Sequence, residues 1–469
     1  MTETRAEEID NAPPAPMEMV EDDQARRDLV DRIEGLLDNA QLEEAERVIL
    51  ELHSADLADL LEQLGPDDRR LVIGLIRPQL SEDPEFLTHL GEAVRVDVLD
   101  LLSPEEVARA LTELDSDDAL YVVEDLDEEK REAVLARLPT SERKLVEEGL
   151  TFPEYSAGRL MQREMVAVPM FWTVGKTIDF LRESEDLPED FYLIIMVDPR
   201  FRPVGGALLS RILRSRRSIK LADLMDEDLR VIPADMDQEE VGFLFRQYSL
   251  VSAPVVDENG RLLGVITVDD VVDVIQEENE EDLLKLGGVQ EEDRTSTVWE
   301  TTRRRSTWLG VNLLTAVLAS AVIGLFETTI AEIVALAVLM PIVASMGGNA
   351  GTQTLTVTVR GLATKEISGR NARRLIMKEL AVGLLNGVIF ALVGAAVAWA
   401  WFGDPILGGI IGLAMVITLI VAALSGGLIP MALTRLNIDP AIASGVFLTT
   451  VTDVVGFFTF LGLAAWIIL

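Results

Sequence analysis

The last apolar segment of the chain, residues 441–468, reads AIASGVFLTTVTDVVGFFTFLGLAAWII. It is longer than the roughly 20 residues that a helix needs to cross a bilayer. Its single charge, Asp453, lies about midway along it, beside Thr449, Thr450 and Thr452. A charge at the centre of a membrane helix costs about 2.5–3.5 kcal/mol on insertion scales, so such residues generally pair, bind an ion or face water. The segment therefore predicts a membrane helix that lines an ion pathway.

Four more apolar segments precede it, at roughly 307–326, 333–359, 379–402 and 405–434, and each is long enough to span. We expect a five-span α-helical membrane domain over 306–469. Arg303, Arg304 and Arg305 precede the first span, and six bases fall between Arg360 and Lys378. Because positive loops stay inside, both segments should be cytoplasmic in the cell membrane, which places the C-terminus outside.

Charge is divided unevenly along the chain. Residues 306–469 hold seven acids and seven bases, so the net charge of −39 comes from residues 1–305. A polyanion of this kind attracts cations and repels nucleic acid, which excludes a nucleic-acid partner. The chain has no cysteine and two histidines, so a bound metal should be a hard, oxygen-liganded ion such as Mg²⁺, Ca²⁺ or Mn²⁺. Without a signal peptide at its start, the soluble half should remain in the cytoplasm.

The soluble half has three predicted parts and a linker. Residues 1–22, with three prolines among acids, are expected to be a disordered tail. Residues 23–150 show apolar residues at helical spacing, interrupted by starts such as Ser103-Pro104-Glu105-Glu106, which predicts an acidic all-α domain. Residues 280–305 should form a linker helix into the membrane.

Residues 151–279 alternate β runs with helices, twice in the same order. The later copy predicts a helix at 238–247, strands at 253–256 and 262–267, and a helix at 268–275. The earlier copy predicts a helix at 174–183, strands at 192–197 and 204–208, and a helix at 209–213. Together with Ser252–Asp257 and Gly264–Asp270, this order resembles a tandem pair of cystathionine-β-synthase (CBS) motifs, an α/β fold.

The second span contains Pro341 followed by the glycine-rich stretch Gly347–Gln353, which suits an irregular or closely packed segment facing protein or water. Simple helix packing through small residues is the alternative. With Thr449–Gly456, the CBS pair and the acidic helical domain, the chain over about 23–469 resembles MgtE-type magnesium transporters.

That resemblance implies a transporter or channel and not an enzyme. It implies a homodimer in the lipid bilayer, with Mg²⁺ both as the ion moved and as the ligand that closes the pore from the cytoplasm. In the pore, the residue matching Asp453 binds hydrated Mg²⁺ and the one matching Asn349 lies nearby, while Thr449 would add a neutral oxygen. This chain departs from the family pattern at Thr449, at Gly445 and at Tyr121, where an acid is often found.

The resemblance also implies regulatory carboxylates, which would repel one another at low Mg²⁺ and be bridged at high Mg²⁺. The ligands that the resemblance implies are Asp117, Asp237, Glu239, Asp270, Asp273, Glu278, Glu281 and Asp282. The alternative for each is a solvated helix face or a helix cap. CBS pairs often bind adenosine nucleotides, and Thr267 with Asp270 occupies the usual ribose position, so ATP is a candidate co-regulator.

Three other functions remain open at this point. The same architecture could prefer Mn²⁺, Co²⁺ or Ca²⁺. A CBS-gated anion channel should present bases to its pore, and this chain presents Asp453. An intramembrane aspartyl protease needs a second carboxylate at the same depth, whereas Glu327, Glu332, Asp404 and Asp439 fall near span ends.

Overall fold

The structure, a computed structural model, describes residues 23–468 except 78–79, 81–82, 185–186, 189–190, 227, 288, 290–297, 368–370 and 437. The tail predicted at 1–22 therefore lies outside the described residues. The chain divides into two compact units, with the boundary between Gln276 and Glu277.

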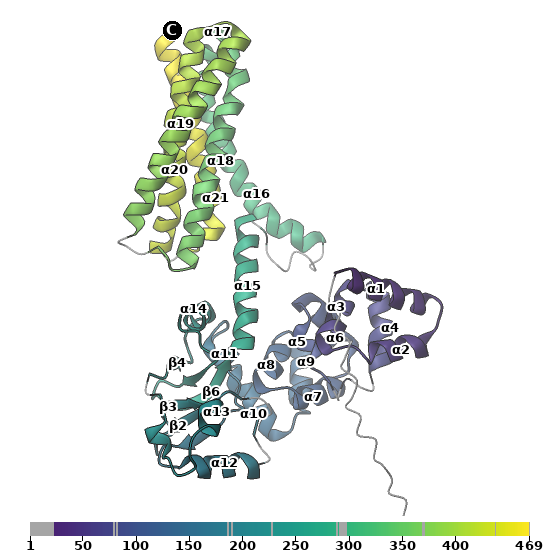
Figure 1. The fold of residues 1–469 in the computed structure, drawn as a ribbon. Helices are drawn as coiled ribbons and strands as arrows, with labels where there is room; N and C mark the ends of the chain where they lie inside the picture. Colours follow the sequence, from purple (N-terminus) through teal and green to yellow (C-terminus); the bar gives the residue numbers. More distant parts are fainter. Residues whose placement is uncertain are drawn as a thin grey trace, which may run out of the picture. The chain divides into compact units, whose positions relative to one another are not determined.

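Short helices make up the first part of the first unit (Figure 1). Their apolar faces share one core that extends from Ile33 to Val146. Local caps explain why the helices are short: Ser103 and Glu106 form a reciprocal capping box, with Pro104 at the first helical position. Within the described residues the helices are α1 Asp23–Asp38, α2 Leu42–Ile49, α3 Ser54–Gln63, α4 Pro66–Ile76, α5 Phe86–His89, α6 Glu92–Leu101, α7 Pro104–Glu113, α8 Ser116–Glu124, α9 Glu128–Leu135 and α10 Thr140–Gly149.

Two three-stranded sheets make up the rest of this unit, in the orders β1-β2-β3 and β4-β5-β6. In each, the first pair is parallel and the second antiparallel, with Ile195 opposite Gly206 and Val255 opposite Gly264. Ile195 and Val265 belong to one buried cluster, which joins the two sheets. The elements are α11 Ala157–Leu160, β1 Ala167–Pro169, α12 Val174–Glu183, β2 Leu193–Val197, β3 Pro203–Leu208, α13 Leu209–Leu213, η1 Leu221–Asp223, β4 Ile232–Pro233, α14 Gln238–Tyr248, β5 Ser252–Val256, β6 Leu262–Thr267 and α15 Val268–Gly287.

The predicted strands and helices of both copies agree with these bounds to within one residue, apart from the last helix. That helix was expected to end at Ile275, but α15 continues to Gly287. It therefore supplies the first part of the linker predicted at 280–305. Residues 288 and 290–297 lie outside the described residues, and from Val298 the chain belongs to α16.

The second unit contains five helices long and apolar enough to cross a membrane, counted over the described residues, as predicted. The third of them begins at Ala372, seven residues before the apolar segment at 379–402. Arg373, Arg374 and Lys378 are good helix formers and extend the helix. The helices of this unit are α16 Val298–Gly324, the short α17 Glu327–Glu332, α18 Ala335–Ala363, α19 Ala372–Phe402, α20 Pro405–Arg435 and α21 Pro440–Ile468.

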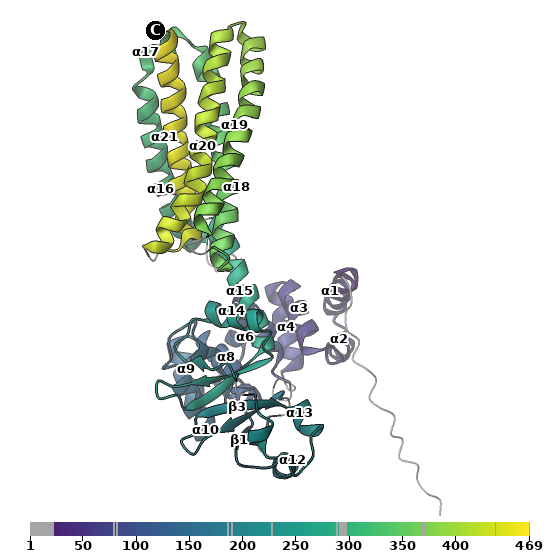
Figure 2. The same cartoon turned by 60° about the vertical axis from the view of Figure 1, so that its left-hand side comes forward.

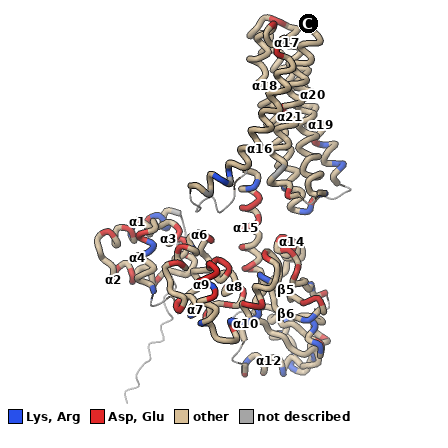
Figure 3. Tube along the Cα trace, turned by 180° about the vertical axis from the view of Figure 1, so that it is seen from behind, with Lys and Arg blue, Asp and Glu red and all other residues tan. Residues whose placement is uncertain are grey.

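Helix α20 is the centre of this bundle and packs along α18, α19 and α21 (Figure 2). In its most apolar window 61% of the residues are buried, against 11% for α19. Figure 3 shows the bundle helices as long tan stretches, whereas acidic residues are spread over the first unit. The outward apolar face of α19 therefore suits lipid.

Candidate functional site

Asp453 lies thirteen residues into α21 and is half-buried. Thr449 precedes it by four residues, so the two side chains share one face of the helix. Thr449 is exposed, whereas Leu448 and Thr452, on the adjoining face, are fully buried. The neighbouring hydroxyls bond within the helix: Thr449 donates to Gly445 O at 3.1 Å and Thr452 to Thr449 O at 3.0 Å. The Thr449–Asp453 face of α21 is therefore open within the described chain.

Helix α18 runs antiparallel beside α21 at the level of Asp453. A methyl group placed on Gly347 would lie 3.5 Å from Thr452 Cβ, and one on Gly351 would lie 2.8 Å from Leu448 Cδ1. The approach at Gly351 is too close for a side chain, and a methyl group on Gly347 would also lie 2.7 Å from Thr418 Cγ2 of α20, which accounts for two glycines of the Gly347–Gln353 motif. The motif is continuous α-helix, so the irregular segment allowed by the sequence is wrong and the close-packed one is correct.

Asn349 lies at this level too, but on another side of α18. It follows Gly347 by two residues, which corresponds to a rotation of about 200° around the helix. Its side chain is exposed, and Nδ2 donates to Ser345 Oγ at 3.4 Å. Among the described residues nothing joins Asn349 to Asp453. The chain therefore brings Thr449 and Asp453 together and leaves Asn349 apart from them.

A carboxylate cluster lies in the first unit, where the start of α8 faces α15. Asp117 is buried, and its Oδ1 has no hydrogen-bond partner among the described residues. Burial, followed by the charges of Asp270 and Asp118, raises the pKa of Asp117 well above its usual value. Burial and then Asp270 raise the pKa of Asp118 to about 7. These carboxylates are destabilised as anions, so the cluster favours a proton or a cation.

Asp270 is the partner of this cluster on α15. Burial raises its pKa to about 6, although Thr267 opposes the shift by donating a hydrogen bond from Oγ1 to Asp270 Oδ2 at 2.6 Å. Sequence reasoning chose Asp117 and Asp270 but missed Asp118. The signal was present in the adjacent acids at the start of α8, whereas their proximity to α15 is a tertiary property.

Polar contacts hold α8 against the CBS part at its N-terminal end. Ser116 Oγ donates to Glu164 Oε2 at 2.7 Å, and the Arg163 backbone N–H donates to Ser116 Oγ at 2.7 Å. Glu164 also accepts from the Arg163 N–H at 3.0 Å. The cluster of carboxylates is therefore positioned by bonds that need no metal.

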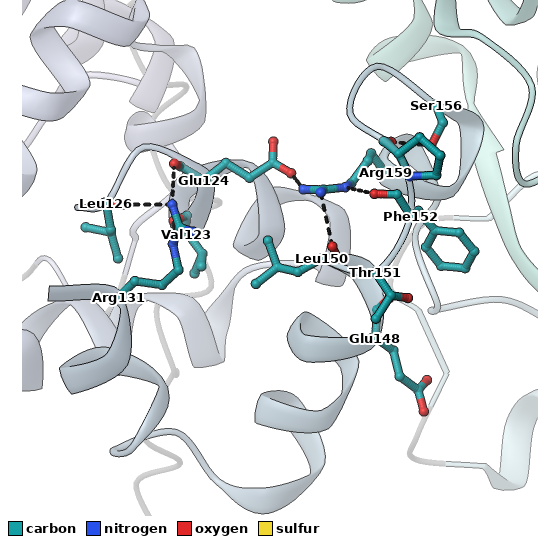
Figure 4. Close-up of polar contacts among 11 residues, drawn as sticks. Val123, Glu124, Leu126, Arg131, Glu148, Leu150, Thr151, Phe152, Ser156 and Arg159 are labelled. Atoms are coloured by element: carbon teal, nitrogen blue, oxygen red, sulfur yellow. Dashed lines mark hydrogen bonds and ion pairs between the residues drawn. The ribbon is translucent and has the colours of Figure 1, made fainter. Parts of the chain in front are cut away.

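At the C-terminal end of α8, Arg159 of α11 forms an ion pair with Glu124 (Figure 4). The same guanidinium donates to the carbonyls of Phe152, at 2.9 Å, and Leu150, at 3.2 Å. Glu124 in turn accepts through its backbone carbonyl from Arg131 at 3.0 Å. Arg159 thus links the end of the helical domain to the start of the CBS pair.

Among the remaining predicted ligands, Asp273 lies one turn after Asp270 on α15, and its charge helps to raise the pKa of Asp270. Asp237 is exposed and caps α14, accepting from the Glu239 N–H at 2.9 Å, and Glu239 and Asp273 are exposed as well. In the described part of the chain, no three carboxylate or histidine side chains are arranged to hold a metal ion. Tyr121, at the position noted as a departure from the family pattern, stacks on the Arg95 guanidinium at 3.9 Å.

A second acidic group lies in the second unit. Lys285 contacts Glu281 at 2.7 Å and Asp439 at 3.1 Å. Burial and then the charge of Asp439 raise the pKa of Asp282. Glu278, one turn before Asp282, is half-buried. Asp439 was missed because in the sequence it is only an acid before Pro440, and there it caps α21 by accepting from the Ala441 N–H at 2.8 Å.

Three family models match the chain. The model described as a divalent cation transporter, MgtE, matches residues 340–463, the MgtE intracellular N domain matches 52–155, and the CBS domain matches 221–277. The magnesium transporter MgtE of Bacillus subtilis (strain 168) is 31% identical over 93% of this chain and 97% of that protein. The magnesium transporter MgtE of Thermus thermophilus is 33% identical over 89% of this chain and 93% of that protein.

Among solved structures, the cytosolic domain of the Mg²⁺ channel MgtE in complex with ATP is 32% identical, with a TM-score of 0.47, over 52% of this chain and 99% of that one. The similarity to the two full-length relatives covers the membrane spans as well as the soluble half. It confirms the resemblance predicted from the CBS order, the glycine motif and Thr449–Gly456. The chain belongs to the MgtE family of magnesium transporters.

Proposed function

We propose that two copies of this chain form a pore that carries hydrated Mg²⁺ across the cell membrane and closes when cytoplasmic Mg²⁺ binds the soluble half. The observation that carries the proposal is the open face of α21 that presents Thr449 and half-buried Asp453 midway along a spanning helix. A carboxylate at that depth needs a counter-charge. No cation contacts Asp453 in the described residues, so the permeating ion is the natural partner.

Mg²⁺ keeps its water shell tightly, so a carboxylate can bind it through those waters without removing them. Two copies of Asp453, one from each subunit, neutralise one Mg²⁺. Such binding is strong enough to attract the ion and weak enough to release it. The exposed side of α18 would place Asn349 toward the partner subunit, where its amide can hydrogen-bond the same waters.

The regulatory site is proposed at Asp117, Asp118 and Asp270, supported by the buried Asp117 Oδ1 and the raised pKa values of the three acids. Without a metal, the carboxylate repulsion opposes the contacts of Ser116 and Arg159 that hold α8 in place. The three side chains are not already spaced to hold a metal ion, so Mg²⁺ would draw them together; once bound between them it removes the repulsion and favours the packed arrangement. The other acids predicted from the family pattern would join as the units rearrange: Asp237, Glu239, Asp273, Glu278, Glu281 and Asp282.

ATP is proposed as a co-regulator at Thr267 and Asp270. A ribose hydroxyl could donate to Asp270 in place of Thr267 Oγ1, which now does so at 2.6 Å. Because Asp270 also belongs to the carboxylate cluster, nucleotide and Mg²⁺ would be coupled through one side chain. By the distribution of bases, the soluble half is cytoplasmic and the C-terminus external.

The chain has no cysteine, which permits a direct test. A single Thr449→Cys variant should be linked to its partner by a short bis-maleimide, giving a covalent dimer. The link should stop Mg²⁺ uptake into proteoliposomes, while Leu392→Cys, at an exposed position of α19, is the control for modification itself. Absence of a dimer, or full uptake by the linked dimer, would contradict the paired pore. Competition by Mn²⁺, Co²⁺ and Ca²⁺ in the same assay ranks the alternative cargoes.

A further inference from the structure

Glu379 is a buried carboxylate that takes no part in the ion pathway proposed above. It lies seven residues into α19 and is 8% exposed. Carboxylates inside membrane helices are rare and usually functional. Sequence reasoning treated this residue as the edge of a span, so it was not considered as a candidate.

Glu379 is held by a residue of the neighbouring α18. Thr354 Oγ1 donates to Glu379 Oε2 at 3.0 Å, and Thr354 is itself 5% exposed. Between helices α18, α19, α20 and α21 this is the only hydrogen bond in the part of the chain that the structure describes. Glu379 also has no ion pair among those residues. The side chain therefore serves as an acceptor that joins two helices.

The hydrogen bond is made beside a close approach of α18 and α20. A methyl group on Gly426 of α20 would lie 2.6 Å from Gly351 O and 2.9 Å from Thr354 Cβ. Thr358, one turn further along α18, is fully buried and donates to Thr354 O at 2.8 Å. Three helices are thus fixed at one point by backbone contact and one polar bond.

This point is close to the pore segment of α18. Thr354 follows Asn349 by five residues, a rise of about 7.5 Å, within one continuous helix. At Gly347 and Gly351, α18 has no side chain of its own, and Thr418 of α20 and Leu448 of α21 pack against its backbone. The hydrogen bond at Thr354 adds a directional constraint on the rotation of α18 about its axis.

We infer that Glu379 is a positioning residue of the ion pathway: through Thr354 it fixes the rotation of α18 and thereby the direction of Asn349. The inference rests on the proposed function. Because the carboxylate acts as an acceptor, a glutamine at this position should be sufficient. The negative charge itself is not required.

The test measures initial uptake of Mg²⁺ and of Ca²⁺ by the full chain in proteoliposomes. Glu379→Gln should keep the Mg²⁺ rate within about twofold and the Ca²⁺ to Mg²⁺ ratio unchanged. Glu379→Met and Thr354→Val, which remove the acceptor and the donor, should each lower Mg²⁺ uptake by about three- to twentyfold, the range of interhelical hydrogen bonds in membranes, and raise the ratio. The double variant should be no worse than the poorer single variant.

Two results would overturn the inference. One is Glu379→Gln as impaired as Glu379→Met while Thr354→Val behaves as wild type, which would assign the role to the charge. The other is wild-type rate and ratio in Thr354→Val, a variant that preserves side-chain shape and should fold. Asp453→Ala in the same experiment separates the two proposals: its loss of uptake supports the pore, whatever the Glu379 variants do, and retained uptake refutes the pore itself.

Discussion

Replacing Asp118 by asparagine should stabilise the metal-free protein and weaken its response to Mg²⁺. Asp118 lies in the carboxylate cluster with Asp117 and Asp270, and burial with Asp270 raises its pKa to about 7. An acid with a raised folded-state pKa binds protons more strongly in the folded protein. The free energy of unfolding therefore falls as pH rises from about 4 to about 7, and stays low above that.

The size of the effect follows from the pKa. A shift from 3.8 to about 7 corresponds to roughly 4 kcal/mol at 1.36 kcal/mol per pKa unit. Part of that shift is repulsion shared with Asp270, so we expect Asp118→Asn to gain about 2–4 kcal/mol at pH 8. For a unit of this size that corresponds to a rise in Tm of about 4–16 °C.

Thermal unfolding of the purified protein at pH 8, in chelator and in Mg²⁺, measures both effects. Wild type should gain stability from Mg²⁺ and Asp118→Asn should gain much less, because the variant has already lost the repulsion. Asp31→Asn, which removes one charge from an exposed site in α1, should change neither value. A lower Tm for Asp118→Asn in chelator, or an undiminished Mg²⁺ response, would refute the view that repelling carboxylates oppose the packed arrangement.

Three further changes follow from individual contacts. Glu164→Ala removes the acceptor of Ser116, so closure should need about tenfold more Mg²⁺, because hydrogen bonds to charged groups contribute about 1.5–3 kcal/mol; Mg²⁺ titration of uptake measures the shift. Lys285→Met removes the ammonium that lies between Glu281 and Asp439 and would compete with Mg²⁺ for these carboxylates, so closure should need less Mg²⁺. An unchanged Mg²⁺ concentration at half-closure would contradict this competition. Gly426→Ala should destabilise the bundle by about 1–3 kcal/mol through overpacking, seen in thermal unfolding, whereas Gly409→Ala in the same helix meets nothing within 4 Å and should be neutral.

Local signals in the sequence were sufficient for most of the fold. The hairpin at Asp257–Gly260 was predictable because an Asn-Gly pair favours a tight turn with positive φ. Gly260 has a φ of +74° in the structure. The five spans followed from apolar length alone. The start of α19 could not be placed because a run containing Arg373 and Lys378 suits a cytoplasmic loop and a helix equally well.

The candidate sites were predictable only in part. Asp453 was found because a charge in an apolar segment is visible in the sequence. Asp118 and Asp439 were not found, since their environment depends on residues more than one hundred positions away. Asn349 shows the opposite case: the family pattern selected it, and its direction away from Asp453 within the chain follows from the packing of Gly347 and Gly351.

The central claim is that Mg²⁺ crosses the membrane by way of the Asp453 carboxylate. Mg²⁺ uptake into proteoliposomes, followed with an indicator dye for wild type and Asp453→Ala side by side in Mg²⁺-free internal buffer, tests it most directly. We predict rapid uptake by wild type and none above empty liposomes for the variant, at equal protein incorporation. Wild-type uptake by Asp453→Ala would contradict the claim.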